Sequence, residues 1–185
     1  MSFPLDLVEK LSLQSPQSTF TQGFAIVDSA ADTRILETLG WARHKIGPYT
    51  MFVASGTEIC ILKRERTQLM LVGLAFSGDK NKSVAEVLGE ILASGNHQRG
   101  SHLCGRFAIV TWGDDKLTLS GDPGHSRTLF YSRKKPFAAG SHAGLLQAIC
   151  GLRPDQRTLR FMASSDYPKK ADSVPTRKLY TVSIP

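Results

Sequence analysis

Three histidines and three cysteines are the side chains of this sequence best suited to catalysis or metal binding. His102, His125 and His142 lie in segments that a meander of strands would bring together, but their spacing matches no metal-ligand motif. The cysteines stand far apart in apolar segments and form no Cys-x-x-Cys pair: Cys60, Cys104 and Cys150. We therefore expect no bound metal, and reduced thiols that pack inside their segments.

Two hydroxyl residues could act as nucleophiles if the chain were trimmed to expose them. Removal of the initiator methionine would expose Ser2, and a cut before Thr21 would expose a threonine at the start of an expected strand. Ser2 is disfavoured because Pro4 and a helical apolar stripe follow it instead of a buried strand. A hydrolase activated by cleavage near Thr21 stays as an alternative function.

One loop combines residue types that suit a polar pocket. His125 and Arg127 lie between two expected strands, and loops of this kind often carry binding sites. Just before them, Asp122 stands in a Gly-Asp-Pro-Gly segment, which predicts a turn and does not match a phosphate-binding loop. His125 and Arg127 are therefore the candidates for a residual polar pocket.

The elements that must position these residues are short strands and a few helices. Runs of β-branched and aromatic residues predict strands at Thr21–Val27, Tyr49–Ala54, Ile59–Lys63, Leu69–Phe76, Cys104–Trp112, Lys116–Leu119, Thr128–Ser132 and Lys178–Ile184. Helical spacing predicts helices at Ala30–Ala42, from Ser83 to near Gly95, at Ala143–Gly151 and at Asp155–Ala163. Ser83 and Glu86 form a capping-box pattern, and Ser55-Gly56-Thr57 predicts a hairpin turn between the second and third strands.

Strands that follow one another in groups, separated by one or two helices, exclude a doubly wound parallel sheet. The pattern predicts an α+β fold with antiparallel sheets and helices on their outer faces. The length of 185 residues fits one domain, and no apolar run approaches the roughly 20 residues of a membrane span. The start of the chain has no cleavable signal pattern, so we expect a cytoplasmic protein with no membrane partner.

The net charge of +7 raises the question of nucleic-acid binding. The basic residues gather in four clusters that fall in expected loops or strand ends: Lys63–Arg66, Arg133–Lys135, Lys169-Lys170 and Arg177-Lys178. No nucleic-acid-binding motif accompanies them, and aromatic residues are not interleaved with them as stacking platforms. We expect these clusters to be solvated turns and do not expect a nucleic-acid partner.

Several short motifs follow one another in a definite order. They are Arg43–Pro48, the expected helix after Ser83, Leu103-Cys104-Gly105-Arg106-Phe107-Ala108, Asp122 followed by Thr128–Tyr131, and Phe137–Ser141. Together they resemble the glutaminase domain of asparagine synthetases, the class II glutamine amidotransferases, which are N-terminal-nucleophile hydrolases. The resemblance implies a four-layer αββα sandwich over residues 20–185, with residues 1–19 as an N-terminal extension.

The resemblance also assigns catalytic positions, and most of them hold the wrong residue type. Gln22 stands where the family has its N-terminal cysteine nucleophile, and it has neither a thiol nor a free α-amine to act as base. Val72 replaces the oxyanion asparagine, although the following Gly73 is kept. Val84 replaces the aspartate that binds the glutamine ammonium group. Arg64 or Arg66 would bind the glutamine carboxylate.

These replacements predict a degenerate amidotransferase-like domain without glutaminase activity. The resemblance extends to β-lactam synthetases and lasso-peptide cyclases, whose N-terminal domains also lack the nucleophile. The domain would then support an ATP-dependent amide-forming ligase, and ATP and Mg would belong to a synthetase domain whose Ser-Gly-Gly-x-Asp-Ser loop is absent from this sequence. Expected partners are a synthetase domain in cis or in trans, or a second copy in a homodimer. A stand-alone protein-interaction domain with a basic surface is a further alternative.

Overall fold

The computed structural model describes residues 20–95, 102–124, 126–132, 135–151 and 182–184. The expected extension at 1–19, the expected helix at Asp155–Ala163 and His125 lie outside these ranges, as does most of the expected strand at Lys178–Ile184.

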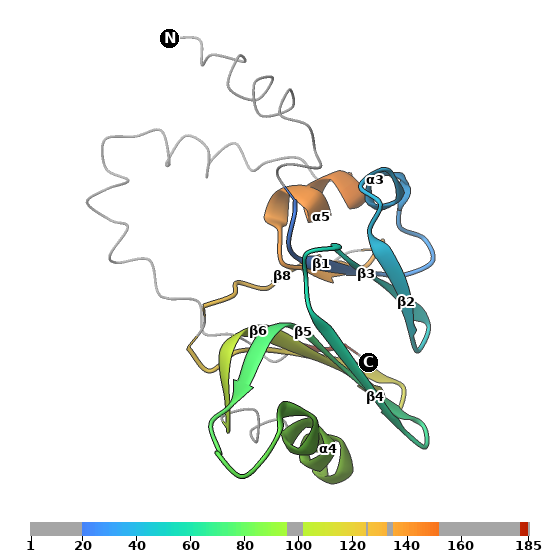
Figure 1. Cartoon of the computed structure of the whole chain (residues 1–185). Helices are drawn as coiled ribbons and strands as arrows, with labels where there is room; N and C mark the ends of the chain where they lie inside the picture. Colours follow the sequence, from blue (N-terminus) through green and yellow to red (C-terminus); the bar gives the residue numbers. More distant parts are fainter. Residues whose placement is uncertain (1–19, 96–101, 125, 133–134, 152–181, 185) are drawn as a thin grey trace, which may run out of the picture.

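Two five-stranded antiparallel sheets form the framework (Figure 1). The first has the order β2-β3-β1-β9-β8, with bounds Ala42–Ile46, Tyr49–Val53, Phe24–Val27, Ala138–Gly140 and Phe130–Tyr131. The second has the order β10-β7-β6-β5-β4, with bounds Val182–Ile184, Lys116–Gly121, Leu103–Gly113, Thr67–Ser77 and Ile59–Arg64. The expected α+β class with antiparallel sheets is therefore confirmed.

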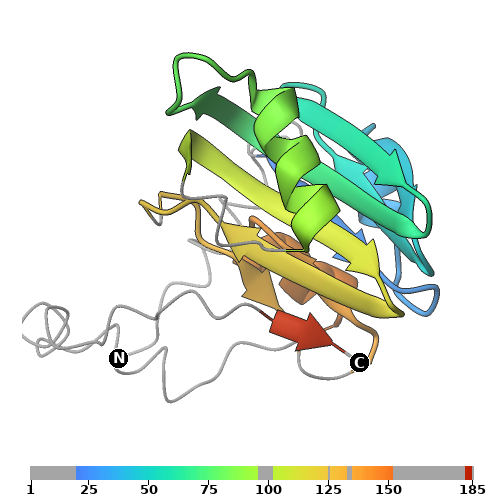
Figure 2. The ribbon, with the colours of Figure 1, turned by 90° about the horizontal axis from the view of Figure 1, so that it is seen from below.

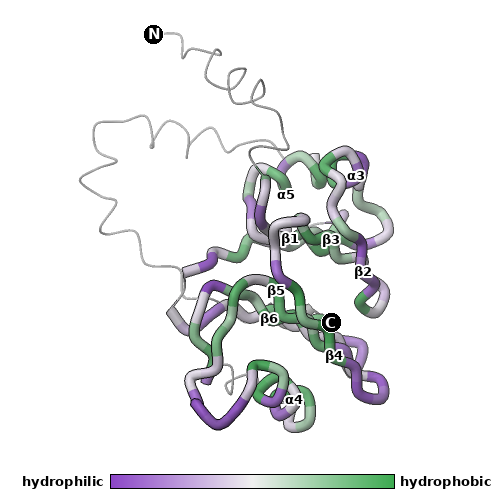
Figure 3. The backbone as a smooth tube through the Cα atoms, in the orientation of Figure 1, coloured by the Kyte–Doolittle hydropathy of each residue, from purple (hydrophilic) through white to green (hydrophobic). Residues whose placement is uncertain are grey.

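Apolar residues fill three spaces, one between the sheets and one on the outer face of each. Alternate residues of a strand point to opposite faces, so Phe24 and Ile26 of β1 pack between the sheets while Ala25 and Val27 pack outward. The outward face meets α3 (Arg34–Thr38) and α5 (Ala143–Ile149) through Leu36, Leu145 and Leu146. In Figure 1 these two helices lie over the first sheet. Figure 3 shows much of β1, β3, β5 and β6 in green, the colour of hydrophobic residues.

The outer face of the second sheet is covered by α4 (Val84–Ser94), which lies across its strands in Figure 2. Val87, Leu88 and Ile91 form its buried stripe against β5 and β6. The predicted capping box is present: the Glu86 amide donates to Ser83 Oγ at 3.2 Å, and the Ser83 amide donates to Glu86 Oε2 at 2.7 Å. The helix ends at Gly95, whose φ of 63° is the left-handed conformation that a glycine cap adopts readily.

The predicted hairpin between Tyr49–Ala54 and Ile59–Lys63 is wrong. A turn does form, with the Thr57 amide donating to Ala54 O at 2.9 Å, but β3 and β4 belong to different sheets. β3 pairs with β1 and β2, and β4 pairs with β5, so the turn carries the chain from one sheet to the other. Turn chemistry alone does not distinguish a hairpin from a crossing, because the strand partners decide it.

The predicted helix at Ala30–Ala42 is also too long. Only Arg34–Thr38 is helical, and Ala42–Ile46 is strand β2, which forms a hairpin with β3 through Gly47-Pro48. Leu36 is the buried residue of the short helix, so a longer one would gain little from packing. In the part of the chain that the structure describes, no helix has the length and apolar character needed to cross a membrane.

Candidate functional site

A pocket of about 220 Å³ opens at one end of the space between the sheets. Gln22 and Arg106 line it, and each stands two residues before a core residue, Phe24 at the start of β1 and Ala108 within β6. The two residues thus continue the inward-facing rows of β1 and β6 beyond the apolar core. The full lining comes from four segments: Gln22, Arg106, Ser126, Arg127, Thr128, Phe130, Ser141 and His142.

Arg127 is the most deeply placed cation of this pocket, with only 7% of the residue exposed. Its Nη1 atom is buried and has no hydrogen-bond partner. Burial is the main cause that lowers the pKa of Arg127, and the nearby positive charge of Arg106 lowers it further, while Asp122 acts in the opposite direction. Arginine keeps its proton at physiological pH, so this is a buried positive charge that Asp122 offsets only in part.

Asp122 is the acidic residue that acts on this charge. It is 1% exposed, and its carboxylate accepts hydrogen bonds from the backbone amides of Ser126, at 2.9 Å, and Arg127, at 3.1 Å. The predicted turn at this aspartate is therefore present. The carboxylate holds the loop backbone, and no ion pair between it and the Arg127 guanidinium is present among the described residues.

Ser141 and His142 form the opposite wall. Ser141 Oγ lies 2.9 Å from His142 Nδ1 and also accepts the Phe24 amide at 3.0 Å. Burial lowers the pKa of His142, and the charges of Arg127 and Arg106 lower it further, so the ring is neutral at pH 7. A serine beside a histidine resembles a nucleophile and its base, but within the described residues no carboxylate orients this ring, and the serine oxygen already binds the start of β1.

Gly23 permits the close approach of β1 to this wall. Its φ of 144° is a conformation that residues with a side chain rarely adopt, and a Cβ there would overlap Ser141 Oγ and His142 Cε1. Its amide donates to Thr57 Oγ1 at 2.7 Å. The beginning of β1 is therefore held between the β3–β4 crossing and the Ser141–His142 wall.

The family positions assigned from sequence do not all meet at the pocket. Gln22 lines it, but Val72 is fully buried in the core between the sheets. The Gly73 amide donates to Glu58 O at 2.8 Å, so it is already used in sheet pairing. Val84 begins α4 and packs on the outer face of the second sheet.

The arginines proposed for carboxylate binding lie elsewhere. Arg64 ends β4 and pairs with Thr67, and Arg66 is in the turn that follows, at the opposite end of β5 from the Leu74–Arg106 pair. Of the two residues predicted to form a polar pocket, Arg127 lines it and His125 lies outside the described residues. Sequence reasoning missed Arg106 and Ser141; the alternation of β6, read backwards from Ala108, could have indicated Arg106.

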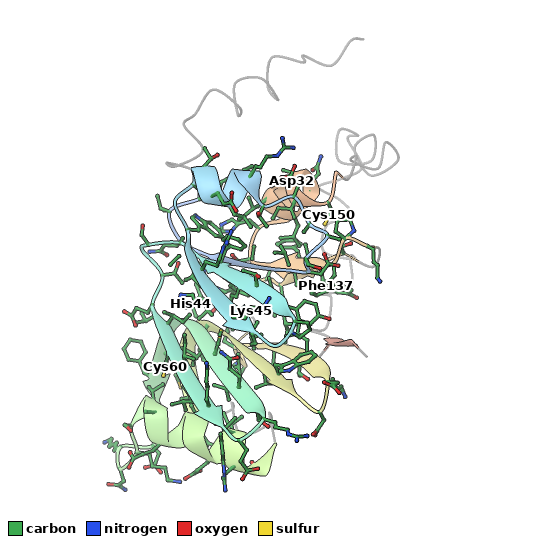
Figure 4. The ribbon with its side chains drawn as sticks, turned by 90° about the vertical axis from the view of Figure 1, so that its right-hand side faces the viewer. Asp32, His44, Lys45, Cys60, Phe137 and Cys150 are labelled. Carbon is green, nitrogen blue, oxygen red and sulfur yellow. The ribbon has the colours of Figure 1, made fainter. Side chains whose placement is uncertain are left out.

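The expectation that Cys104 packs inside its strand is wrong, because this residue is exposed. Its neighbours across the strand pair are also open, with Phe76 56% and Leu74 46% exposed. Cys60 and Cys150 are half-buried and far apart in Figure 4: Cys60 belongs to β4, and Cys150 follows α5. Burial raises the pKa of the Cys150 thiol. No three His, Cys, Asp or Glu side chains among the described residues could together hold a metal ion.

The sequence matches no family model, and no curated protein matches it. The pocket is therefore the feature of the molecule that bears on function. Its described lining offers two guanidinium groups, a neutral imidazole, an amide and hydroxyls, and it includes no acidic side chain.

Proposed function

We propose that this chain is a glutaminase-like domain that has lost glutamine hydrolysis and supports an ATP-dependent amide-forming ligase. The observation that carries the proposal is Gln22, which lines the pocket at the start of β1, where the resemblance assigns the cysteine nucleophile. On this proposal, the two sheets with helices over their outer faces form the αββα sandwich of the N-terminal-nucleophile hydrolases.

The proposed loss of hydrolysis has three chemical grounds. The Gln22 carboxamide is not a nucleophile, and its own nitrogen is a peptide nitrogen, which cannot act as the base. The Val72 side chain has no donor for an oxyanion, and the Gly73 amide is occupied by Glu58 O. A glutamine ammonium group would meet Arg106 and Arg127 in the pocket, with no described acidic lining residue to bind it.

The proposed supporting role follows from the same family resemblance. In a ligase of this kind the ATP and Mg chemistry resides in a synthetase domain, and this chain would contact that domain in cis or in trans. The exposed pair of Leu74 and Phe76, on the strand that pairs with Arg106 and Cys104, favours a contact of this sort, because large apolar side chains gathered on a surface often mark interfaces.

Ammonia release from millimolar glutamine tests the loss of hydrolysis. The purified chain, verified by intact mass at 20.2 kDa, is compared with an active class II glutaminase. We expect ammonia at the level of the buffer blank. Release well above the blank that persists in the verified full-length chain would overturn the proposal, and release that accompanies a lighter chain cut before Thr21 would support the self-cleaving alternative.

A further inference from the structure

We propose that the pocket between the start of β1 and the β7–β8 loop is a binding site for a compact oxyanion, held by Arg106 and Arg127. The ligand chemistry is that shared by phosphate and carboxylate groups, two anions that guanidinium groups recognise through paired hydrogen bonds. The inference goes beyond the loss of glutaminase activity and rests on the charges and burial of this pocket alone.

The first ground is the buried cation. Arg127 is 7% exposed, and its Nη1 has no partner although the residue lines an open pocket. A buried ionised group without a partner is unfavourable, and arginine cannot lower that cost by losing its proton. Among the described residues no ion pair joins Asp122 to the guanidinium: its carboxylate accepts the Ser126 and Arg127 backbone amides, and it acts on the Arg127 charge without direct contact. An anion in the pocket would place a negative charge beside this guanidinium.

The second ground is the pairing of like charges. Arg106 lines the same pocket, and its charge is felt by both Arg127 and His142. No described acidic residue forms an ion pair with either arginine. Two cations held near each other repel. An oxyanion between them would be attracted to both guanidinium groups and would offset that repulsion.

The third ground is the selectivity of the remaining lining. Ser126 and Thr128 contribute hydroxyl groups, and neutral His142 can donate a hydrogen bond. No described lining residue is acidic, so no negative side chain of the lining would attract a cationic ligand. The pocket of about 220 Å³ is smaller than the roughly 300–1,000 Å³ of sites for drug-sized ligands, which indicates a compact anion.

Calorimetric titration of the full chain tests the site. Inorganic phosphate and acetate form the two arms, each balanced with chloride so that the ionic strength stays constant. We expect saturable binding of at least one anion, and the tighter arm identifies the source of the oxyanion group. No saturable binding in either arm would overturn the proposal.

Variants separate a specific site from general positive charge. Arg106 is exposed, so Arg106→Gln should fold normally and weaken binding at least tenfold. Arg64→Gln removes the same charge from an exposed position at the far end of β4 and should leave the affinity unchanged. Arg127→Lys keeps a charge but loses the planar fork and should also weaken binding. Equal affinities for Arg106→Gln and the unmodified chain would contradict the inference. Ammonia release is measured separately, so either proposal can fail while the other stands.

Discussion

At the scale of single residues, the pocket depends on how Asp122 uses its carboxylate. Both oxygens accept backbone amides of the loop that carries Arg127, and no ion pair joins this carboxylate to the guanidinium among the described residues. A buried aspartate thus orders the loop, while Arg127 Nη1 stays buried without a hydrogen-bond partner. Changes at neighbouring residues should therefore affect loop geometry and ligand binding together.

Substitution of Gly23 by alanine tests the close approach at the start of β1. The added Cβ would meet Ser141 and His142, and the φ of 144° disfavours any side chain. We expect a loss of about 1–3 kcal/mol in the free energy of unfolding, measured by urea denaturation. Gly89→Ala is the matched control because a Cβ there meets nothing within 4 Å in the middle of α4, and it should raise stability by roughly 0.5–1 kcal/mol. Equal effects of the two changes would contradict this account.

The pH dependence of stability should report on His142. Arg127 and Arg106 face this ring, and together with burial they lower its pKa below 6.5 in the folded state. The unfolded chain then binds a proton more readily than the folded chain, so stability should decrease as the pH falls below about 6.5. Urea denaturation at pH 7.5 and pH 5.5 measures the difference, with about one pH unit on each side of that value.

Two substitutions assign the effect. His142→Gln should reduce the loss of stability at acidic pH, whereas His44→Gln, on β2 and outside the pocket lining, should leave that loss in place. An unchanged pH dependence in His142→Gln would show that another group is responsible.

At the scale of elements, α4 is the part of the fold most completely specified by local sequence. The Ser83–Glu86 capping box, the apolar stripe and the final glycine all point to the same helix. Ser83→Ala should lower the free energy of unfolding by about 1 kcal/mol, since the Glu86 amide loses its acceptor. Ser55→Ala, at an exposed turn residue, is the control and should change stability little. Chemical denaturation curves of both variants check the difference.

The same local reasoning could predict α4, β1, β5 and the β6–β7 hairpin, but not β2. Residues Ala42–Ile46 follow a helical stretch, and only pairing with β3 makes them a strand. The turn at Ser55–Thr57 could be predicted, but its role as a crossing could not, because its sequence fits both a hairpin and a crossing between sheets. In both cases tertiary pairing overrode local preference.

Two lining residues could be assigned to a site from the sequence, Arg127 from its loop and Gln22 from the family resemblance. Arg127 could be inferred from its place between two strands, whereas Arg106, Ser141 and His142 reach the pocket from separate segments. Their meeting depends on two sheets packing face to face, which is not encoded in any short window. The sequence alone therefore did not indicate that these side chains line one pocket.

At the scale of the whole molecule, the packing of the two sheets disfavours a polar side chain at Val72. Val72→Asn would restore the residue type that the resemblance assigns to the oxyanion site. The side chain is fully buried between the sheets, so the amide would be placed among apolar residues. We expect a loss of about 1–3 kcal/mol in stability and no ammonia release from glutamine. Ile61→Asn, at a 37% exposed position of β4, should cost less.

We propose that this pocket binds a compact anion and does not bind glutamine. The most direct test of this proposal is the thermal unfolding midpoint of the full chain with phosphate, acetate or L-glutamine, at equal concentration and constant ionic strength. A ligand that binds only the folded state raises this midpoint. We expect the unfolding midpoint to rise with at least one of the two anions and not with glutamine. A rise with glutamine, or no rise with either anion, would contradict it.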